Sequence, residues 1–190
     1  FAAIAACLPI LVTGGIHMDG YLDTVDALSS HQTREKKLAI MKDANCGAFA
    51  VIYGGVYLLA YAGFAYEVFA AGHILLICPL FVLSRALSGL CAVNLPNARR
   101  SGMLCAFTSG VQRRRATAAL TLVGLAAAAG MVWMSPTAGG MAAAFAVVSA
   151  LKYRRFALAQ FGGVTGDTSG FFLQLCELCG LIGIWIGGLL

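Results

Sequence analysis

The chain has 190 residues, of which 60% are hydrophobic and 11% are charged, and its formal net charge is +5. Soluble domains carry roughly 25% charged residues, so this composition excludes an ordinary soluble domain and predicts an integral membrane protein. The basic residues form no stripe with interleaved aromatic residues, which argues against nucleic acid as a partner. The seven cysteines are scattered and odd in number, so they favour simple packing over a disulfide framework.

Long runs without charge predict the membrane helices, because a span needs about 20 apolar residues. The runs cover residues 47–66, 68–93 with His73 and Arg85 inside, 116–134, a shorter 138–151, and 171–190 with the single Glu177. Residues 1–12 are also apolar but too few to span, and we interpret them as the end of a helix whose beginning is missing. The expected fold is all-α and polytopic, with about five to six transmembrane helices and a short interfacial helical segment. One membrane-embedded domain is expected over residues 1–190, lacking its N-terminal helix region.

The basic residues predict the orientation in the membrane. Twelve of the thirteen lie in alternate connections, while the connections at 67–72 and 135–137 contain none. The positive-inside rule makes the basic side cytoplasmic. Every polar motif lies on that side, so an active site is expected to face the cytoplasm. The twelve residues are Arg34, Lys36, Lys37, Lys42, Arg99, Arg100, Arg113, Arg114, Arg115, Lys152, Arg154 and Arg155.

Three of the eight acidic residues stand in the stretch from Gly14 to Asp26. If residues 16–29 are helical, Asp19, Asp23 and Asp26 share one face within about 60°. Like charges so close repel one another, and a divalent cation such as Mg²⁺, which prefers oxygen ligands, would relieve the repulsion. The alternative is an acidic stripe on a solvated helix. His17 lies about 160° from that face, which favours a structural hydrogen bond over a role as base.

Two further segments carry charge near the predicted membrane surface. Residues 31–43 predict a short helix capped by Thr33, either an interfacial amphipathic helix resting on anionic lipid or part of the site. It ends at Lys42 and Asp43, where Asp43 could join the acidic cluster. Arg85 lies inside an apolar run, so we expect it to meet a carboxylate or a substrate phosphate rather than to snorkel.

Residues 94–102 break a helix and present Arg99 and Arg100, of which at most one needs to contact a ligand. We assign the basic residues at 113–115 to topology and lipid headgroups. A second polar centre follows at 160–170, where four glycines in nine residues allow the backbone to approach a ligand closely. The next helix would offer its N-terminal amides to an anion.

On that last helix, Asp167, Gln174 and Glu177 fall on one face. Glu177 would lie two to three turns inside an apolar segment, where an unpaired carboxylate is costly, so it is a functional candidate. For Asp167 the alternative is a capping role at the start of the helix.

These segments, in this order, resemble the cobalamin (vitamin B12) synthase family. Members carry Gly-Gly-Leu-His-Leu-Asp-Gly-Leu-Ala-Asp-x-x-Asp-Gly, which resembles residues 14–27, and the family's Arg-x-x-x-x-Leu-x-Ile-Met-Lys-Asp motif is similar to residues 34–43. Further matches are Ser84-Arg85, the Pro-x-Ala-Arg at 96–99, and the Gly-Gly-x-Thr-Gly-Asp-x-x-Gly at 162–170 followed by Glu177. The departures, which remove no charged group, are Ala27, Ala44, Ala50 and Phe171-Phe172.

The resemblance implies transfer of adenosylcobinamide phosphate from adenosylcobinamide-GDP to α-ribazole, or to its 5′-phosphate, with release of GMP at the bacterial inner membrane. It implies Mg²⁺ held by Asp19, Asp23, Asp26 and Asp167. The hydroxyl proton would go to His17 or to whichever of Asp19, Asp23 and Asp26 is not coordinated. Expected partners are the two substrates and membrane lipid, with assembly as a homo-oligomer or with other cobalamin-pathway enzymes. The expected substrate-binding residues are Lys42, Asp43, Arg85, Arg99, Thr165, Gly166 and Glu177.

Two other functions are weighed against this one. A CDP-alcohol phosphotransferase also holds a metal with spaced Asp residues, but its Asp-Gly-x-x-Ala-Arg pattern fails here, where Leu22-Asp23 follow Asp19-Gly20-Tyr21. An ion-coupled transporter would place charged groups in broken helices at the midplane. The acidic residues of this chain cluster instead at the ends of connections, and no inverted repeat is visible.

Overall fold

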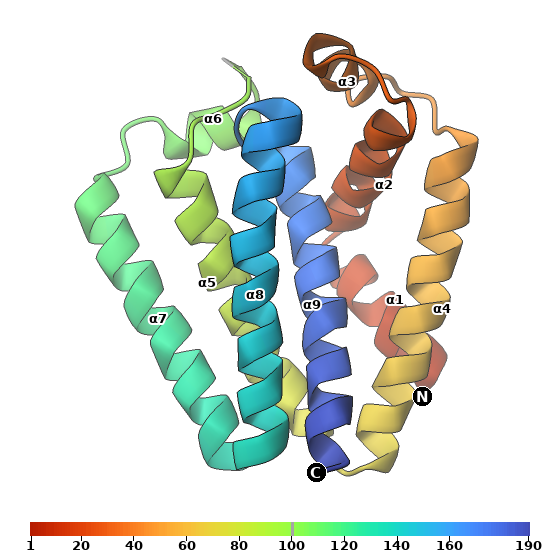
Figure 1. Cartoon of the computed structure of the whole chain (residues 1–190), viewed down its shortest axis with the longest axis vertical. Helices are drawn as coiled ribbons and strands as arrows, with labels where there is room; N and C mark the ends of the chain where they lie inside the picture. The colour runs from red at the N-terminus through yellow and green to blue at the C-terminus, as the bar shows by residue number, and fades with distance from the viewer. Residues whose placement is uncertain (100) are drawn as a thin grey trace.

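The computed structural model describes residues 1–99 and 101–190, so Arg100 lies outside the described residues. Most of the described chain is helical, and the one β-bridge there joins Asn97 to Val164 (Figure 1). The elements are α1 (Ala2–Val12), α2 (Ile16–Ser29), α3 (Arg34–Ile40), α4 (Ala48–Ala70), the 3₁₀ turn η1 (Ile74–Leu76), α5 (Ile77–Asn94), α6 (Met103–Thr108), α7 (Arg113–Met134), α8 (Pro136–Phe161) and α9 (Gly166–Gly188).

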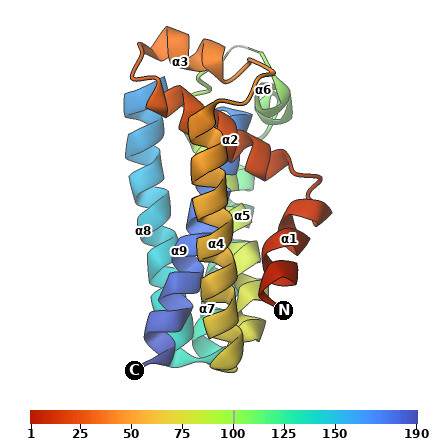
Figure 2. The same cartoon turned by 90° about the vertical axis from the view of Figure 1, so that its right-hand side faces the viewer.

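Within the described residues, four segments are long and apolar enough to cross a membrane, namely α4, η1 with α5, α7 and α9. The helices α1 and α2 pass the same test together, although the chain bends by 94° between them. Helix α8 returns along α9 from one end of the bundle to the other (Figures 1 and 2). Its 26 residues reach about 39 Å at 1.5 Å per residue. The expected all-α polytopic fold is confirmed.

Two expected boundaries were wrong. The short run at 138–151 is part of the longer α8, so Lys152, Arg154 and Arg155 are helical rather than in a connection. Nothing breaks this helix before Gly162, which takes the left-handed φ of 69° that ends many helices. The apolar run at 68–93 is divided, because α4 continues to Ala70 and the chain turns at Gly72, with φ 77°.

Helix α9 stands at the centre of the bundle and contacts α8, α2, α4 and α5. Small residues let it approach α8 closely. A Cβ atom on Gly183 would lie 2.8 Å from the Cα of Ala142, and one on Gly187 would lie 2.6 Å from the Cα of Ala138. Such contacts between backbones replace a hydrophobic driving force in lipid, because they maximise van der Waals packing.

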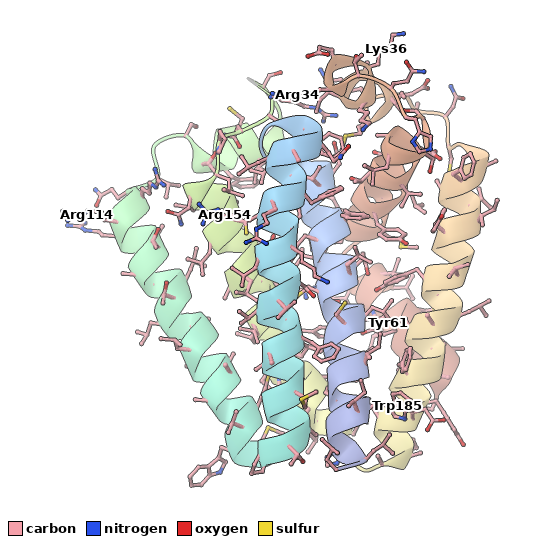
Figure 3. The ribbon with its side chains drawn as sticks, viewed as in Figure 1. Arg34, Lys36, Tyr61, Arg114, Arg154 and Trp185 are labelled. Carbon is pink, nitrogen blue, oxygen red and sulfur yellow. The ribbon has the colours of Figure 1, made fainter. Side chains whose placement is uncertain are left out.

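The two ends of the bundle differ in charge. Helices α3 and α6 and the connections at 41–47 and 162–165 lie at one end, which we call the basic end (Figure 1). Figure 3 shows Arg34 and Lys36 at this end and Trp185 near the other. The tight turns at 71–73 and 135 lie at that opposite end and contain no Lys or Arg. The charge asymmetry expected from the sequence is therefore present in the fold.

Candidate functional site

The two polar centres of the sequence meet where α2 crosses α9. The helix expected over residues 16–29 is confirmed as α2. A Cβ atom on Gly20 would lie 2.7 Å from the carbonyl oxygen of Asp167, and one on Gly170 would lie 2.8 Å from that of His17. The glycines thus bring the two backbones into contact. Asp23 lies within electrostatic range of Asp167 as a result.

Arg99 reaches the same place from the segment before α6. Ala98 N–H donates to the carbonyl of Val164 over 2.9 Å, and Val164 N–H donates to that of Pro96 over 2.9 Å. Gly163 permits this pairing, because a Cβ atom there would lie 2.2 Å from the Pro96 oxygen. The Arg99 guanidinium then forms an ion pair with the Asp167 carboxylate, Nη1 to Oδ2, at 2.8 Å.

Arg99 keeps one buried donor without a partner. Its Nη2 donates to the carbonyl of Leu38 over 3.1 Å, while its Nε is buried and makes no hydrogen bond within the described chain. An unmade bond from a buried donor costs about 1–3 kcal/mol, so an acceptor at this position would be stabilised. Arg99 lines a cavity of about 90 Å³, together with Thr165, Gly166 and Asp167 among others.

The first turn of α9 forms one wall of that cavity. Thr165 caps the helix, because its Oγ1 accepts from Thr168 N–H over 3.1 Å and Thr168 Oγ1 accepts from Thr165 N–H over 2.9 Å. The first backbone N–H groups of a helix have no acceptor within the helix, and this capping box satisfies only some of them. The cavity therefore combines an arginine with a helix N-terminus, which suits a phosphate group.

The expected metal ligands differ in whether their carboxylates already have a partner. Asp19 is exposed and Asp23 half-buried, and within residues 1–99 and 101–190 neither side-chain carboxylate makes a hydrogen bond or ion pair. Asp167 already pairs with Arg99. No group of three or more His, Cys, Asp or Glu side chains in this part of the chain is arranged closely enough to hold a metal ion. The magnesium site remains a prediction, for which Asp19 and Asp23 offer free oxygen donors.

Asp26 has a structural partner that the sequence did not reveal. Its carboxylate accepts from Gly47 N–H over 2.5 Å and from Ala50 N–H over 2.8 Å, so it caps the N-terminus of α4. The negative charge also complements the helix dipole. None of residues 43–47 caps α4 with its side chain. This missing cap was the one feature that could have indicated the structural role of Asp26.

Three other expected residues lie apart from this cluster. His17 is half-buried within electrostatic range of Arg85, and its ring makes none of the expected hydrogen bonds in the described part of the chain. Lys42 is exposed. Asp43 accepts from the backbone N–H of Asn45 over 3.0 Å and from its side chain over 2.8 Å, which lowers the pKa of the Asp43 carboxyl. No hydrogen bond or ion pair among the described residues joins Asp43 to the carboxylates of α2.

Arg85 has the carboxylate partner expected for it. Its guanidinium pairs with Glu177, which is 3% exposed, and it also donates to Ser84 Oγ over 2.9 Å. Ser84 in turn donates to Glu177 over 3.1 Å. One turn away on α9, Gln174 accepts a hydrogen bond from the hydroxyl of Tyr57. The polar face expected on α9 is therefore satisfied internally.

Comparison with known proteins agrees with these motifs. The family model described as cobalamin-5-phosphate synthase matches residues 1–185. The adenosylcobinamide-GDP ribazoletransferase of Lachnoclostridium phytofermentans is 41% identical over 177 residues, which cover 93% of this chain and 67% of that protein. Those of Pseudomonas fluorescens and Sinorhizobium sp are 32% and 34% identical, and the matches cover 96% and 94% of this chain and 74% and 70% of theirs.

No solved structure matches the chain. The family match extends over almost every residue, including both polar centres, and it decides against a CDP-alcohol phosphotransferase and an ion-coupled transporter. The chain belongs to the cobalamin-5-phosphate synthase family.

Proposed function

We propose that this protein transfers the adenosylcobinamide-phosphate group from adenosylcobinamide-GDP to α-ribazole, or to α-ribazole 5′-phosphate. The family membership and the names of the relatives support this activity. In the structure, the observation that best supports this activity is that the Arg99–Asp167 ion pair lies beside the carboxylates of α2. Anion-binding and cation-binding groups adjoin each other there, as a pyrophosphate substrate requires.

The reaction sets three demands on the site. A ribose hydroxyl oxygen of the ribazole forms a bond to the cobinamide phosphorus, and the bond from that phosphorus to the bridging oxygen breaks. GMP leaves with the bridging oxygen, and the hydroxyl proton passes to a base. The site must therefore hold the pyrophosphate, neutralise charge that shifts to the leaving group, and aim the hydroxyl in line.

Arg99 and the start of α9 meet the first demand. The unpartnered Nε of Arg99 and the amides of the first turn would donate to phosphate oxygens in the adjoining cavity. Asp167 holds the guanidinium through its ion pair, and the Leu38 carbonyl holds the other side of it. Thr165 keeps the helix start in place through the capping box. The side chain is thus oriented before the substrate binds.

The carboxylates serve the remaining demands. The carboxylates of Asp19 and Asp23 would supply oxygen donors to Mg²⁺, since hard oxygen donors are its preferred ligands and neither carboxylate has a protein partner in the described chain. When bound, the ion neutralises charge on the pyrophosphate. The hydroxyl proton would go to an uncoordinated carboxylate of this cluster or to His17. Asp26 caps α4, and this contact holds α2 in place beside the site.

The proposed setting is the bacterial inner membrane, with the basic end in the cytoplasm. The positive-inside rule supports this orientation, because both tight turns at the opposite end lack Lys and Arg. The substrates would then enter from the cytoplasm, where nucleotides are available. Assembly with further copies or with other enzymes of the pathway stays a prediction, which cross-linking in membranes would check.

The test is a product assay in liposomes with adenosylcobinamide-GDP, α-ribazole and Mg²⁺. We expect GMP and the cobalamin product to form in equal amounts, and to be lost with a chelator and in Asp23→Asn and Asp167→Asn. Glu67→Gln is the matched control, because this exposed carboxylate lies near the other end of α4. Full activity in Asp23→Asn and Asp167→Asn would overturn the site, and failure of the folded wild-type protein to form either product would overturn the activity.

A further inference from the structure

A second cavity, unrelated to the carboxylates, lies between α5, α7 and α8. Helices α7 and α8 meet at Ser135 and diverge toward the basic end (Figure 1). The cavity between them and α5 has a volume of about 450 Å³. We call it the wedge cavity and define it by Leu87, Leu90, Asn94, Arg113, Leu151 and Arg154.

The wedge cavity is amphipathic along the direction of the helices. Both α5 and α8 run toward the basic end, so Leu87, Leu90 and Leu151 lie deeper in the membrane than the polar residues that follow them. The two cationic side chains are Arg113, at the first residue of α7, and Arg154, one turn after Ala150 on α8. The cavity thus has an apolar interior and a positive mouth.

The positive mouth has no internal counter-ion. Arg113 donates from Nε and Nη2 to the side-chain and backbone oxygens of Asn94, at 3.0 and 3.1 Å, and both acceptors are neutral. The side chain of Arg154 makes no hydrogen bond or ion pair with any described residue. Residues 68–166 contain no Asp or Glu at all, so an anion for this pair must come from outside these helices.

The occupant must match both parts of the cavity. A soluble anion would meet the arginines but would leave the apolar part of the cavity unfilled, and the leucine side chains would lose van der Waals contacts there. An anionic phospholipid carries its phosphate at the membrane surface and its acyl chains below it, in the same order as the cavity. Basic pockets between membrane helices on the cytoplasmic side suit such headgroups.

We propose that the wedge cavity binds one anionic glycerophospholipid, with its phosphate between Arg113 and Arg154 and an acyl chain along Leu87, Leu90 and Leu151. Its charge complements Arg113 and Arg154, which line a cavity that has no carboxylate among its lining residues. The site lies on helices other than α2, so it does not depend on the transferase proposal.

The experiment measures lipid binding to the full chain purified in a neutral detergent. Phosphatidylglycerol and phosphatidylcholine with identical acyl chains are titrated separately, and the thermal unfolding midpoint and the bound lipid, by native mass spectrometry, are recorded. We expect one retained phosphatidylglycerol and a higher midpoint, with phosphatidylcholine binding at least tenfold more weakly. Each arginine near an anionic lipid surface contributes about a fivefold factor in affinity. Arg113→Gln/Arg154→Gln should therefore lose about 25-fold.

Two controls separate the site from general surface charge. Arg114→Gln/Arg115→Gln removes the same amount of charge, from two arginines at the start of α7 that do not line the cavity, and Figure 3 shows Arg114 pointing away from the bundle. It should keep the bound lipid. Leu151→Trp fills the cavity and leaves both arginines, and it should lose the lipid.

Three results would overturn the proposal. One is equal binding of the two lipids, and another is equal loss in both double variants. The third is stabilisation by soluble glycerol phosphate as strong as that by phosphatidylglycerol, because it would show that the arginines bind a free anion.

Discussion

The backbone contact between Gly20 and Asp167 makes a sharp prediction about the site. A Cβ atom at position 20 would lie 2.7 Å from the Asp167 carbonyl oxygen and 2.8 Å from its Cα. These are backbone atoms of a helix, so they cannot rotate aside as a side chain would. An ordinary contact of 3.4 Å requires α2 and α9 to separate by about 0.7 Å.

The substitution Gly20→Ala changes the stability of the protein in two opposing ways. Overpacking of a tight contact costs about 1–3 kcal/mol, and the rigid neighbours place this case in the upper half of that range. Alanine gains about 1 kcal/mol of helix propensity over glycine. We therefore expect a net loss of about 1–2 kcal/mol in stability. The larger effect is on activity, because a 1 Å displacement of reacting groups costs about 100-fold, and we expect a loss of roughly 10- to 100-fold.

The assay pairs thermal unfolding with GMP release in liposomes. Gly63→Ala is the control, since this glycine lies on α4 and a Cβ atom there meets nothing within 4 Å. It should keep full activity and an equal or slightly higher unfolding midpoint. Wild-type activity in Gly20→Ala would refute the reasoning, because it would show that the α2–α9 crossing does not position the reacting groups.

Three further predictions concern the residues around the site. Asp26→Ala should destabilise the protein by about 1–2 kcal/mol in thermal unfolding, whereas Asp26→Asn should cost less because its amide oxygen still accepts from Gly47 and Ala50; equal losses would contradict the capping role. Arg85→Met should lower the stability by about 3 kcal/mol in thermal unfolding, because the Glu177 carboxylate loses its cationic partner. Arg85→Met/Glu177→Met should recover most of this stability in the same measurement, and the absence of that recovery would argue against the ion pair. Asp19→Asn should raise the Mg²⁺ concentration needed for half-maximal GMP release, and isothermal titration should show weaker Mg²⁺ binding; an unchanged titration would remove Asp19 from the metal site.

Local patterns in the sequence determined the membrane helices and the faces of α2 and α9. Helical periodicity depends only on spacing, so it predicted that Asp19 and Asp23 share a face and that Glu177 stands inside an apolar segment. The long apolar runs likewise predicted the spans, because burial in lipid depends on composition more than on partners. The position of the basic end was predicted by counting Lys and Arg in each connection, which also depends on composition alone.

Contacts between distant segments were decided only by the tertiary structure. The sequence grouped Asp26 with the other carboxylates, yet packing of α2 against the start of α4 makes it a cap, since Gly47 and Ala50 need an acceptor. The pairing of residues 96–98 with Val164 selects Arg99 to face Asp167. Spacing cannot predict such partners, because they depend on which backbones approach within van der Waals distance, and in this protein the glycines at the helix crossings decide that.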